Sequence, residues 1–208
     1  MRDAIILSIE EVDGRAGALR ANLTASELET LDRLLIDKRR RDWLAGRVAA
    51  KMAGQRVTGL PLSAHEVRTI TEGPERGRPY LTVGATSMYL SITHAGDAAA
   101  AIVSDKPVGL DIEVVQPRPE IETLAFSARE RRAWIGLTGL ERSAAVTRAW
   151  CEKEAISKWR GVGFRDAFSA LTSTHTTQIR RGTFVHRGVL MAWAHASASA
   201  IEQAGQAA

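Results

Sequence analysis

The order of the sequence patterns constrains the fold of this chain most strongly, because a helical pattern followed by short strand patterns occurs twice. Each helical pattern begins at a segment with the form of a capping box, TASE at 24–27 and SARE at 127–130. The 208 residues suffice for one large domain or for two domains of about 100 residues. We therefore predict an α/β fold of two similar-sized halves, residues 1–106 and 107–208, with a ligand-binding cleft between them.

Turn signals and periodicity also predict individual elements. The first helix, or broken pair of helices, should end near Met52, and a third capping-box sequence, SAHE at 63–66, indicates another helix start. The segment QPRP at 116–119 separates the two runs, and no repeat of fixed period relates them, so any relation would be structural only. The predicted strands, in chain order, are PYLTV, MYLSIT, AAAAIVS, PVGLDIEVV, TQIRR, GTFVHRG and VLMAWAHAS.

Composition narrows the class of protein. The single cysteine, Cys151, excludes an internal disulfide framework and a cysteine-based zinc site. The apolar run near the N-terminus is interrupted by Glu10 and Glu11, which indicates a first strand rather than a signal peptide. No later apolar run is long enough to span a bilayer. We expect a cytoplasmic protein with no membrane partner.

The net charge of +4 suggests an anionic partner, and nucleic acid, phosphorylated cofactors and acidic proteins all fit that description. Basic residues concentrate around DKRRRDWLAGRVAAK, where Arg33, Arg40, Arg47 and Lys51 recur near helical spacing. A solvated helix face is the alternative interpretation of this spacing. Charge by itself therefore does not identify the partner.

Two carboxylates alternate with apolar residues in VGLDIEVV at 108–115. In a strand, Gly109, Asp111 and Glu113 point to one face while the apolar residues point to the other. Like charges on one face repel, and a hard divalent cation such as Mg²⁺ would neutralise them, with the glycine leaving room for a ligand. An exposed strand with two solvated acids is the alternative.

The segment WCEKEAISKW at 150–159 places Trp150, Glu154 and Lys158 on one helical face at four-residue spacing. An exposed ion pair is the simplest interpretation of the last two. The tryptophans Trp150 and Trp159 are interpreted mainly as core residues that orient the helix. The segment SITHAG at 91–96 ends a strand with a hydroxyl, an imidazole and a glycine turn. The surrounding sequence has no serine nucleophile elbow, so contact with a phosphate group is a more natural role for this segment than hydrolysis.

Taken together, GLDIE at 109–113 and WCEKEAISKWRGVGF at 150–164 resemble the two signature motifs of the 4′-phosphopantetheinyl transferases. In that family the first motif is a glycine, any residue, aspartate, any residue and glutamate. The second is a tryptophan followed three positions on by lysine, glutamate and a small residue, and then by a lysine. The matching residues here are Gly109, Asp111, Glu113, Trp150, Lys153, Glu154, Ala155 and Lys158, with Gly161 and Gly163 after them.

The resemblance covers most of residues 30–165. RRRDWLAGR is similar to the basic first-domain helix of the family, GRPYL to its Gly-Lys-Pro strand, SITHAG to its Ser-His-x-Gly turn and FSARE to the helix start after the metal strand. The length resembles the larger class, whose two halves are related by pseudo-twofold symmetry around an active-site cleft. That class acts as a monomer on carrier proteins of polyketide, nonribosomal peptide and sometimes fatty acid synthesis.

The resemblance implies transfer of 4′-phosphopantetheine from coenzyme A to a serine of an apo carrier protein, with release of 3′,5′-ADP. It implies that Asp111, Glu113 and Glu154 hold Mg²⁺, with Mn²⁺ as a substitute. Glu154 would also help to deprotonate the serine, and Lys158 would stabilise or protonate the departing 3′,5′-ADP.

The nucleotide end of coenzyme A is assigned by the same resemblance, with departures. Thr93 stands where serine is usual and keeps the hydroxyl, and Arg78 stands for lysine and keeps the charge. Thr30 occupies a position that is often basic and binds the 3′-phosphate, so Arg33 or Arg41 would substitute. The expected coenzyme A contacts are Arg33, Arg41, Arg78, Thr93, His94 and Lys158.

Carrier docking is expected at residues 116–127 and at the turn after Lys158, where Val162 and Phe164 could meet the carrier protein. Core packing is the alternative for both side chains. Two rival functions remain in view. One is a catalytically silent module that binds nucleotide or nucleic acid, and the other is a Mg²⁺-dependent pyrophosphohydrolase that would transfer to water. The acids needed for transfer favour the transferase, which requires no nucleic acid.

Overall fold

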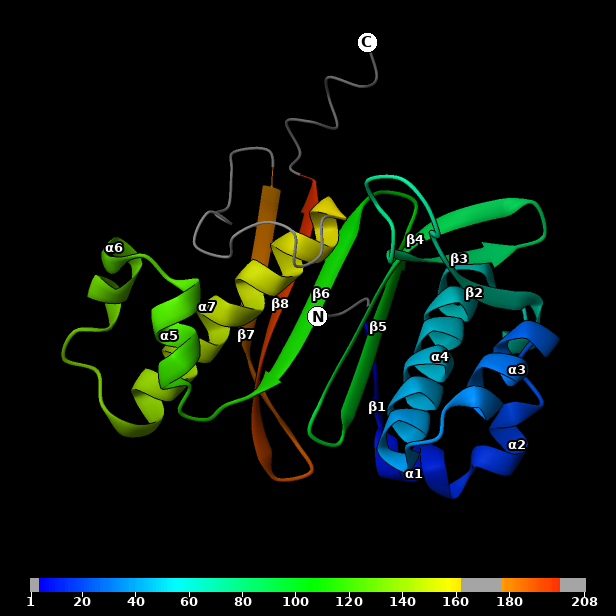
Figure 1. The fold of residues 1–208 in the computed structure, drawn as a ribbon, viewed down its shortest axis with the longest axis horizontal. Coiled ribbons are helices and arrows are strands. Elements are labelled where there is room, and N and C mark those ends of the chain that lie inside the picture. Colours follow the sequence, from blue (N-terminus) through cyan, green and yellow to red (C-terminus); the bar gives the residue numbers. More distant parts are fainter. Residues whose placement is uncertain (1–3, 162–176, 199–208) are drawn as a thin grey trace, which may run out of the picture. The chain divides into compact units, whose positions relative to one another are not determined.

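The computed structural model describes residues 4–161 and 177–198. The chain divides into two compact units, residues 1–108 and 109–208, each with a sheet and a long helix (Figure 1). The predicted α/β class, with two similar-sized halves, is confirmed. Pseudo-twofold symmetry and a cleft between the halves stay predictions.

The first unit is built around a five-stranded antiparallel sheet with the order β1-β5-β4-β3-β2. The long helix α4 packs on this sheet through Ala49, Ala50 and Ala53, whose small side chains let its backbone lie close to Leu81 and Leu90. The elements are β1 (Ile5–Ser8), α1 (Ile9–Gly14), α2 (Ala16–Arg20), α3 (Ala25–Arg33), α4 (Asp37–Thr58), the 3₁₀ turn η1 (Leu62–Ala64), β2 (His65–Thr69), β3 (Pro79–Val83), β4 (Thr86–Ala95) and β5 (Ala98–Ser104).

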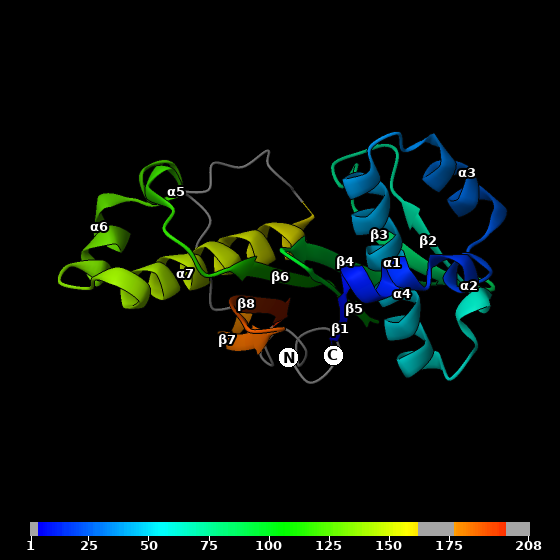
Figure 2. The same ribbon diagram turned by 90° about the horizontal axis from the view of Figure 1, so that it is seen from below.

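The second unit is built around a three-stranded sheet with the order β6-β8-β7. The long helix α7 lies along this sheet, as both ribbon views show (Figures 1 and 2), and packs Cys151, Ala155 and Ile156 against the alanines of β8. The elements are β6 (Val108–Val114), α5 (Pro119–Ala125), α6 (Ala128–Arg131), the 3₁₀ turn η2 (Arg132–Trp134), α7 (Gly139–Arg160), β7 (Thr177–His186) and β8 (Val189–Ala198).

The two units share an element order. In each, a strand comes first, a 22-residue helix follows after short helices, and a hairpin closes the sheet next to the first strand, as β1-β5-β4 and β6-β8-β7. Both long helices end at a glycine in the left-handed conformation, Gly59 with φ 73° and Gly161 with φ 72°. Glycine adopts this conformation without the steric cost of a Cβ, so each helix stops at a defined residue.

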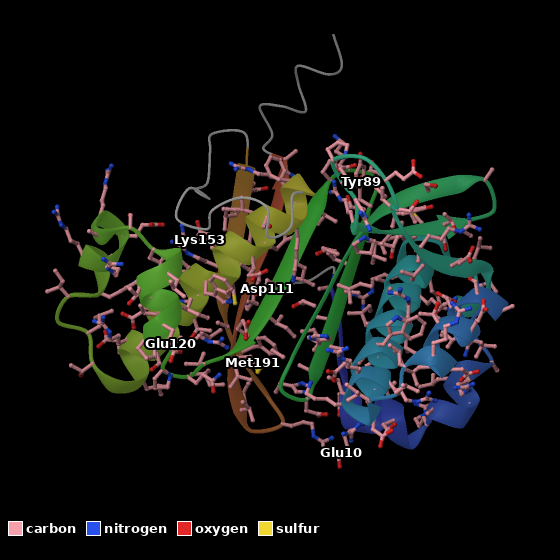
Figure 3. The ribbon with its side chains drawn as sticks, in the orientation of Figure 1. Glu10, Tyr89, Asp111, Glu120, Lys153 and Met191 are labelled. Atoms are coloured by element: carbon pink, nitrogen blue, oxygen red, sulfur yellow. The ribbon has the colours of Figure 1, made fainter. Side chains whose placement is uncertain are left out.

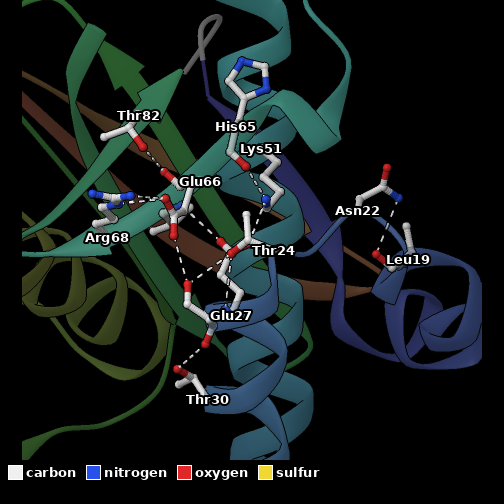
Figure 4. Close-up of polar contacts among 12 residues, drawn as sticks. Leu19, Asn22, Thr24, Glu27, Thr30, Lys51, His65, Glu66, Arg68 and Thr82 are labelled. Atoms are coloured by element: carbon white, nitrogen blue, oxygen red, sulfur yellow. Dashed lines mark hydrogen bonds and ion pairs between the residues drawn. The ribbon is translucent and has the colours of Figure 1, made fainter. Parts of the chain in front are cut away.

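A buried polar network holds α3 and α4 to the edge strand β2 in the first unit (Figure 4). Glu27 closes the capping box with Thr24, accepts a hydrogen bond from the backbone nitrogen of Val67 and pairs with Lys51 at 2.8 Å. The Lys51 ammonium also donates to the carbonyl of His65. These bonds satisfy two charged side chains that are only 3% and 1% exposed.

Some predicted elements differ from the structure. The capping boxes at Thr24 and Ser127 are confirmed, but SAHE at 63–66 does not begin an α-helix, because its glutamate lies in β2 and bonds Ser26 and Arg68. The first helical run is a broken pair, which was one of the two predicted alternatives, but its second helix continues past Met52 to Thr58, where Gly59 ends it. Sequence patterns missed β2 and the helices α1 and α2.

Candidate active site

The strand β6 presents its two carboxylates on the face that α7 covers. Both acids bond side chains of α7, Asp111 to Lys158 and Glu113 to Trp150, as expected for two side chains on one face of a strand. Asp111 is 4% exposed, whereas the side chain of Glu113 is 24% exposed. Figure 3 labels Asp111 on β6 next to α7. Leu110 and Ile112, on the opposite face, are each 1% exposed. This strand is buried on both faces, which means that its charges need partners.

Gly109 makes close packing of β6 and α7 possible. A Cβ built on this residue would overlap the carbonyl oxygen of Ala155 and lie 2.6 Å from the backbone nitrogen of Trp159. The expectation that Gly109 leaves room for a ligand is therefore wrong in this structure, because the helix backbone fills the space. The glycine instead sets how near the carboxylates come to the helix.

Lys158 reaches the strand from the last turns of α7. Its Nζ lies 2.7 Å from Oδ1 of Asp111 and 3.2 Å from the carbonyl oxygen of Leu110. Burial alone would lower the pKa of Lys158, but the carboxylate of Asp111 raises it, so the side chain remains an ammonium. The alternative interpretation, an exposed ion pair formed only by Glu154 and Lys158, is therefore wrong, because Lys158 pairs with Asp111.

Glu113 is held by two donors. Arg118 lies 2.5 Å from its Oε2, and the indole nitrogen of Trp150 donates to its Oε1 at 3.3 Å. Burial, and next the negative charge of Asp111, raise the pKa of Glu113. Trp150 also packs with a hydrophobic cluster that includes Trp134, so its predicted packing role is accompanied by a hydrogen bond to the site.

Glu154 projects from α7 toward the same charges. Burial raises its pKa to about 7, with further increases from Asp111 and Glu113 and an opposing effect of Lys158. A carboxyl group with this pKa takes up and releases a proton near neutral pH, as a general base must. The three predicted acids therefore influence one another electrostatically, although they come from two elements.

The structure does not arrange these acids as a metal-ligand set. Within residues 4–161 and 177–198, no group of three or more His, Cys, Asp or Glu side chains has the arrangement of a metal site. In this structure the cations nearest the strand acids are the side chains of Arg118 and Lys158. The acids therefore have cationic partners outside the strand: Arg118, which follows β6 closely in the chain, pairs with Glu113, and Lys158 of α7 pairs with Asp111.

In the first unit, Arg78 is the predicted nucleotide contact with the most distinctive surroundings. It is 8% exposed, pairs with Glu75 and lies over the ring of Tyr89 at 4.9 Å. A hollow of about 570 Å³ opens beside it, lined by Thr69, Ile70, Thr71, Glu72, Glu75, Pro79, Tyr80, Ser87, Met88 and Tyr89. Aromatic rings and an arginine are suited to a base and its phosphate groups.

The other predicted nucleotide contacts are not gathered with Arg78. Arg33 is exposed and pairs with Glu29, and Arg41 is exposed and lies 4.0 Å from Asp13. Thr93 is buried and His94 is exposed, and as neighbours on β4 they point to opposite faces of the sheet. A shared phosphate contact of these two side chains is therefore not supported by the strand geometry.

Two side chains that contact predicted site residues, Arg118 beside Glu113 and Tyr89 beside Arg78, were not predicted from the sequence. Arg118 belongs to the QPRP segment, which was interpreted as a linker, although a basic residue five positions after Glu113 was a usable signal. Tyr89 was read only as part of a strand. In the predicted docking segment, Leu124 of α5 is 81% exposed. Val162, Gly163 and Phe164 lie outside the described residues.

Family models match both parts of the chain. Residues 107–204 match the 4′-phosphopantetheinyl transferase superfamily, and residues 30–104 match the 4′-phosphopantetheinyl transferase N-terminal domain. The first match contains the acidic strand and α7, and the second contains α4 and the hollow beside Arg78. In the part of the chain that the structure describes, no helix is both long and apolar enough to cross a membrane.

Curated relatives carry related names. The 4′-phosphopantetheinyl transferase AcpT of Salmonella typhimurium is 36% identical over 127 residues, 59% of this chain and 60% of that protein. The 4′-phosphopantetheinyl transferase psf-1 of Bacillus pumilus is 31% identical over 142 residues, 68% of this chain and 58% of that protein. HetI of Nostoc sp., another 4′-phosphopantetheinyl transferase, is 24% identical over 183 residues, 84% of this chain and 76% of that protein. The chain thus spans 60% or less of the first relatives.

Proposed function

Because this chain belongs to the 4′-phosphopantetheinyl transferase superfamily, we propose that it transfers 4′-phosphopantetheine from coenzyme A to a serine of an apo carrier protein. The observation that carries the proposal is the convergence of Asp111, Glu154 and Lys158, in which a base with a pKa of about 7 lies beside a lysine that pairs with an aspartate. In this reaction the serine oxygen bonds to the phosphorus of the phosphopantetheine, and the bond from that phosphorus to 3′,5′-ADP breaks.

We propose that Asp111, Glu113 and Glu154 would hold Mg²⁺, with Mn²⁺ as a substitute, because both ions prefer oxygen ligands, although among the described residues these side chains do not have the arrangement of a metal site. The support is that burial and mutual repulsion raise the pKa of Glu113 and Glu154, so a hard cation with oxygen ligands would relieve the repulsion. When bound, the ion supplies neutralisation of the pyrophosphate charge.

Two side chains of α7 would manage protons and charge. Glu154 would accept the proton of the carrier serine as its oxygen attacks, because its pKa of about 7 suits a base near neutral pH. Lys158, held by Asp111, would stabilise the negative charge that develops on the departing 3′,5′-ADP or protonate it. Both groups lie on one face of one helix, so the helix fixes their spacing.

The hollow beside Arg78 and Tyr89 would receive the nucleotide end of coenzyme A. Arg78 supplies a positive charge and Tyr89 an aromatic face. The proposed contacts for the phosphate groups of coenzyme A are His94, Arg33 and Arg41. Thr93 is also a proposed coenzyme A contact, from a position buried in the sheet. Residues 1–106 would thus serve the nucleotide and residues 107–208 the metal and the transfer.

An apo acyl or peptidyl carrier protein is the proposed partner, with residues 116–127 as its docking segment. Such carriers are usually acidic near the modified serine, and the net charge of +4 would steer the encounter and make it slower at high ionic strength. We also propose that the enzyme works as a monomer in the cytoplasm, on carrier proteins of polyketide or nonribosomal peptide synthesis.

The direct test incubates the protein with coenzyme A, Mg²⁺ and a panel of apo carrier proteins, followed by intact mass spectrometry. The expected result is one carrier that gains a single phosphopantetheine, with loss of the gain when its serine is replaced by alanine. Omission of Mg²⁺ should abolish the gain, and Mn²⁺ should restore it. Cleavage of coenzyme A without modification of any carrier would indicate hydrolysis and overturn the proposal.

A further inference from the structure

Each unit contains one ion pair between a capping-box glutamate and a lysine of its long helix. Glu27 pairs with Lys51 at 2.8 Å, and Glu130 pairs with Lys153 at 2.7 Å. Each lysine is the fifteenth residue of its helix, Asp37–Thr58 or Gly139–Arg160, and their side chains are 1% and 4% exposed. The same device therefore fixes the same turn of both helices, and we call it the glutamate–lysine clamp.

The next residue differs between the units. In α4 the sixteenth residue is Met52, which packs against the hydrophobic core. In α7 it is Glu154, the proposed base. Adjacent helical residues are about 100° apart around the axis, so fixing Lys153 also fixes the direction in which Glu154 leaves the helix.

The Lys153 ammonium contacts the segment at the start of α6. It lies 5.1 Å from the centre of the Phe126 ring and pairs with Glu130. Glu130 in turn accepts hydrogen bonds at 2.8 Å from both the backbone nitrogen and the hydroxyl of Ser127. Lys153, which Figure 3 labels on α7, is thus tied to the start of α6 by a carboxylate that is itself fixed.

The opposite side of the same turn is held by backbone packing. Ala155 is fully buried, and its carbonyl lies where a side chain of Gly109 would be. Glu154 therefore stands between a residue fixed by the clamp and a residue fixed against β6. The two contacts, one on each side of Glu154, limit both the rotation of this helical turn about its axis and its sliding along β6.

We propose that the Glu130–Lys153 clamp positions Glu154 for catalysis and that Lys153 does not contact coenzyme A. This inference rests on the proposed function, because it assigns a role toward the same base. The Glu27–Lys51 clamp serves the fold of the first unit only. The two clamps thus form a matched pair with different functional consequences.

The test compares Lys153→Met with Lys51→Met, because methionine keeps the unbranched chain and removes the charge. Lys51→Met leaves the carboxylate of Glu27, which is 3% exposed, buried without its ion-pair partner. Lys153→Met leaves Glu130 without its partner, but the side chain of Glu130 is 30% exposed and can be solvated. Lys51→Met should therefore lose more stability. Lys153→Met should nevertheless lose more turnover, about ten- to a hundredfold in kcat, because small misplacements of a reacting group have effects of that size.

Control variants keep the comparison decisive. Lys153→Arg retains the charge and should recover most of the lost kcat. If Lys51→Met does not fold, the double variant Glu27→Gln and Lys51→Met removes both charges and replaces it in the comparison. The KM for coenzyme A should stay within about threefold of the wild-type value, because Lys153 is assigned no part in uniform binding of the substrate.

Three outcomes would overturn the proposal. One is a kcat of Lys153→Met within about twofold of wild type, and another is an equal kcat loss in Lys51→Met. The third is a rise of about tenfold in the KM for coenzyme A with unchanged kcat, which would make Lys153 a substrate contact.

Hydrogen exchange separates this inference from the proposed function. In the wild-type protein without coenzyme A or Mg²⁺, amides of residues 153–157 should exchange slowly, and Lys153→Met should accelerate them while Lys51→Met does not. If these amides exchange slowly only when Lys153 is present, but the protein modifies no carrier, the proposed transferase function is wrong and the proposed structural effect of the clamp stands. Unchanged exchange in Lys153→Met would overturn the clamp, whatever the activity.

Discussion

The two units use one scaffold for different chemistry. Each places a 22-residue helix on a sheet whose first strand lies beside a hairpin, and each pins that helix with a glutamate–lysine clamp. The first strand reads IILS in the first unit and VGLDIEV in the second. At positions sixteen and twenty of the helix, α4 carries Met52 and Arg56 where α7 carries Glu154 and Lys158.

The shared scaffold does not itself create the site. At position sixteen of α4 the apolar Met52 packs against the hydrophobic core. At the same position of α7, burial raises the pKa of Glu154 to about 7, because helix packing there desolvates a carboxyl group instead of an apolar side chain. Function follows from a few side chains on a frame that both units possess.

The largest expected effect is the loss of transfer in Asp111→Ala or Glu154→Ala, by about a hundredfold or more, because each removes a charged group from the reacting centre. Met52→Ala, at the position in α4 that corresponds to Glu154, should lower stability and leave transfer unchanged. Initial rates by intact mass spectrometry measure both. If either acid variant retains more than about a tenth of the wild-type turnover, the assignment of the reacting acids to the second unit is wrong.

Next comes the packing of helix on strand. Gly109→Ala should lower the free energy of unfolding by about 2 to 3 kcal/mol, because its Cβ would meet backbone atoms of α7 that can move only with the helix. Gly54→Ala, in α4, should lose less, about 1 kcal/mol, because its Cβ would lie 2.5 Å from the Leu81 side chain and 2.7 Å from that of His65, which can adjust. Urea unfolding compares them, and equal losses would contradict this account.

Replacement of Lys158 by alanine should lower kcat by about tenfold with less effect on the KM for coenzyme A, since its proposed role is strongest in the transition state. Arg56→Ala, at the matching position of α4, should behave as wild type. Steady-state kinetics with varied coenzyme A measures both constants. An unchanged kcat with a large rise in KM would instead make Lys158 a ground-state binding residue.

A smaller effect concerns pH. Glu154 has a pKa of about 7 in the folded protein, against an ordinary value of 4.5, so its stabilising contribution exists below about pH 4.5 and is lost as pH rises toward 7. Without metal, Glu154→Gln should therefore be more stable than the wild type at pH 8, by about 1 kcal/mol once the screening of the Glu154 charge by solvent is included. At pH 4 the two proteins should be equally stable. Thermal unfolding at both pH values checks this, and a difference of the same size at pH 4 would contradict the assignment.

The smallest expected effect belongs to the first unit. His94→Ala should raise the KM for coenzyme A by about threefold and leave kcat unchanged, since His94 is exposed and its bonds would be to the nucleotide. The same variant should have little effect with 3′-dephospho-coenzyme A. If it weakens both substrates equally, His94 does not contact the 3′-phosphate.

Local sequence signals located most elements and the acidic residues. Thr24 and Ser127 were identifiable as helix starts because each is followed three positions on by a glutamate, a relation contained within one helical turn. The same signal failed at Ser63, because sheet pairing of His65 and Glu66 with β3 outweighed it. The turn predicted after Lys158, with Val162 and Phe164, lies outside the described residues and stays a prediction.

The sequence by itself determined that Asp111 and Glu113 share one face of a strand and that Glu154 and Lys158 share one face of a helix, because both relations follow from backbone periodicity. Only the tertiary structure decided that Gly109 admits the helix, that Lys158 meets Asp111, that Glu130 holds Lys153 and that Glu154 has a pKa of about 7. The physical reason is that burial and distances between residues remote in sequence depend on how helix and sheet pack, and no local pattern encodes them.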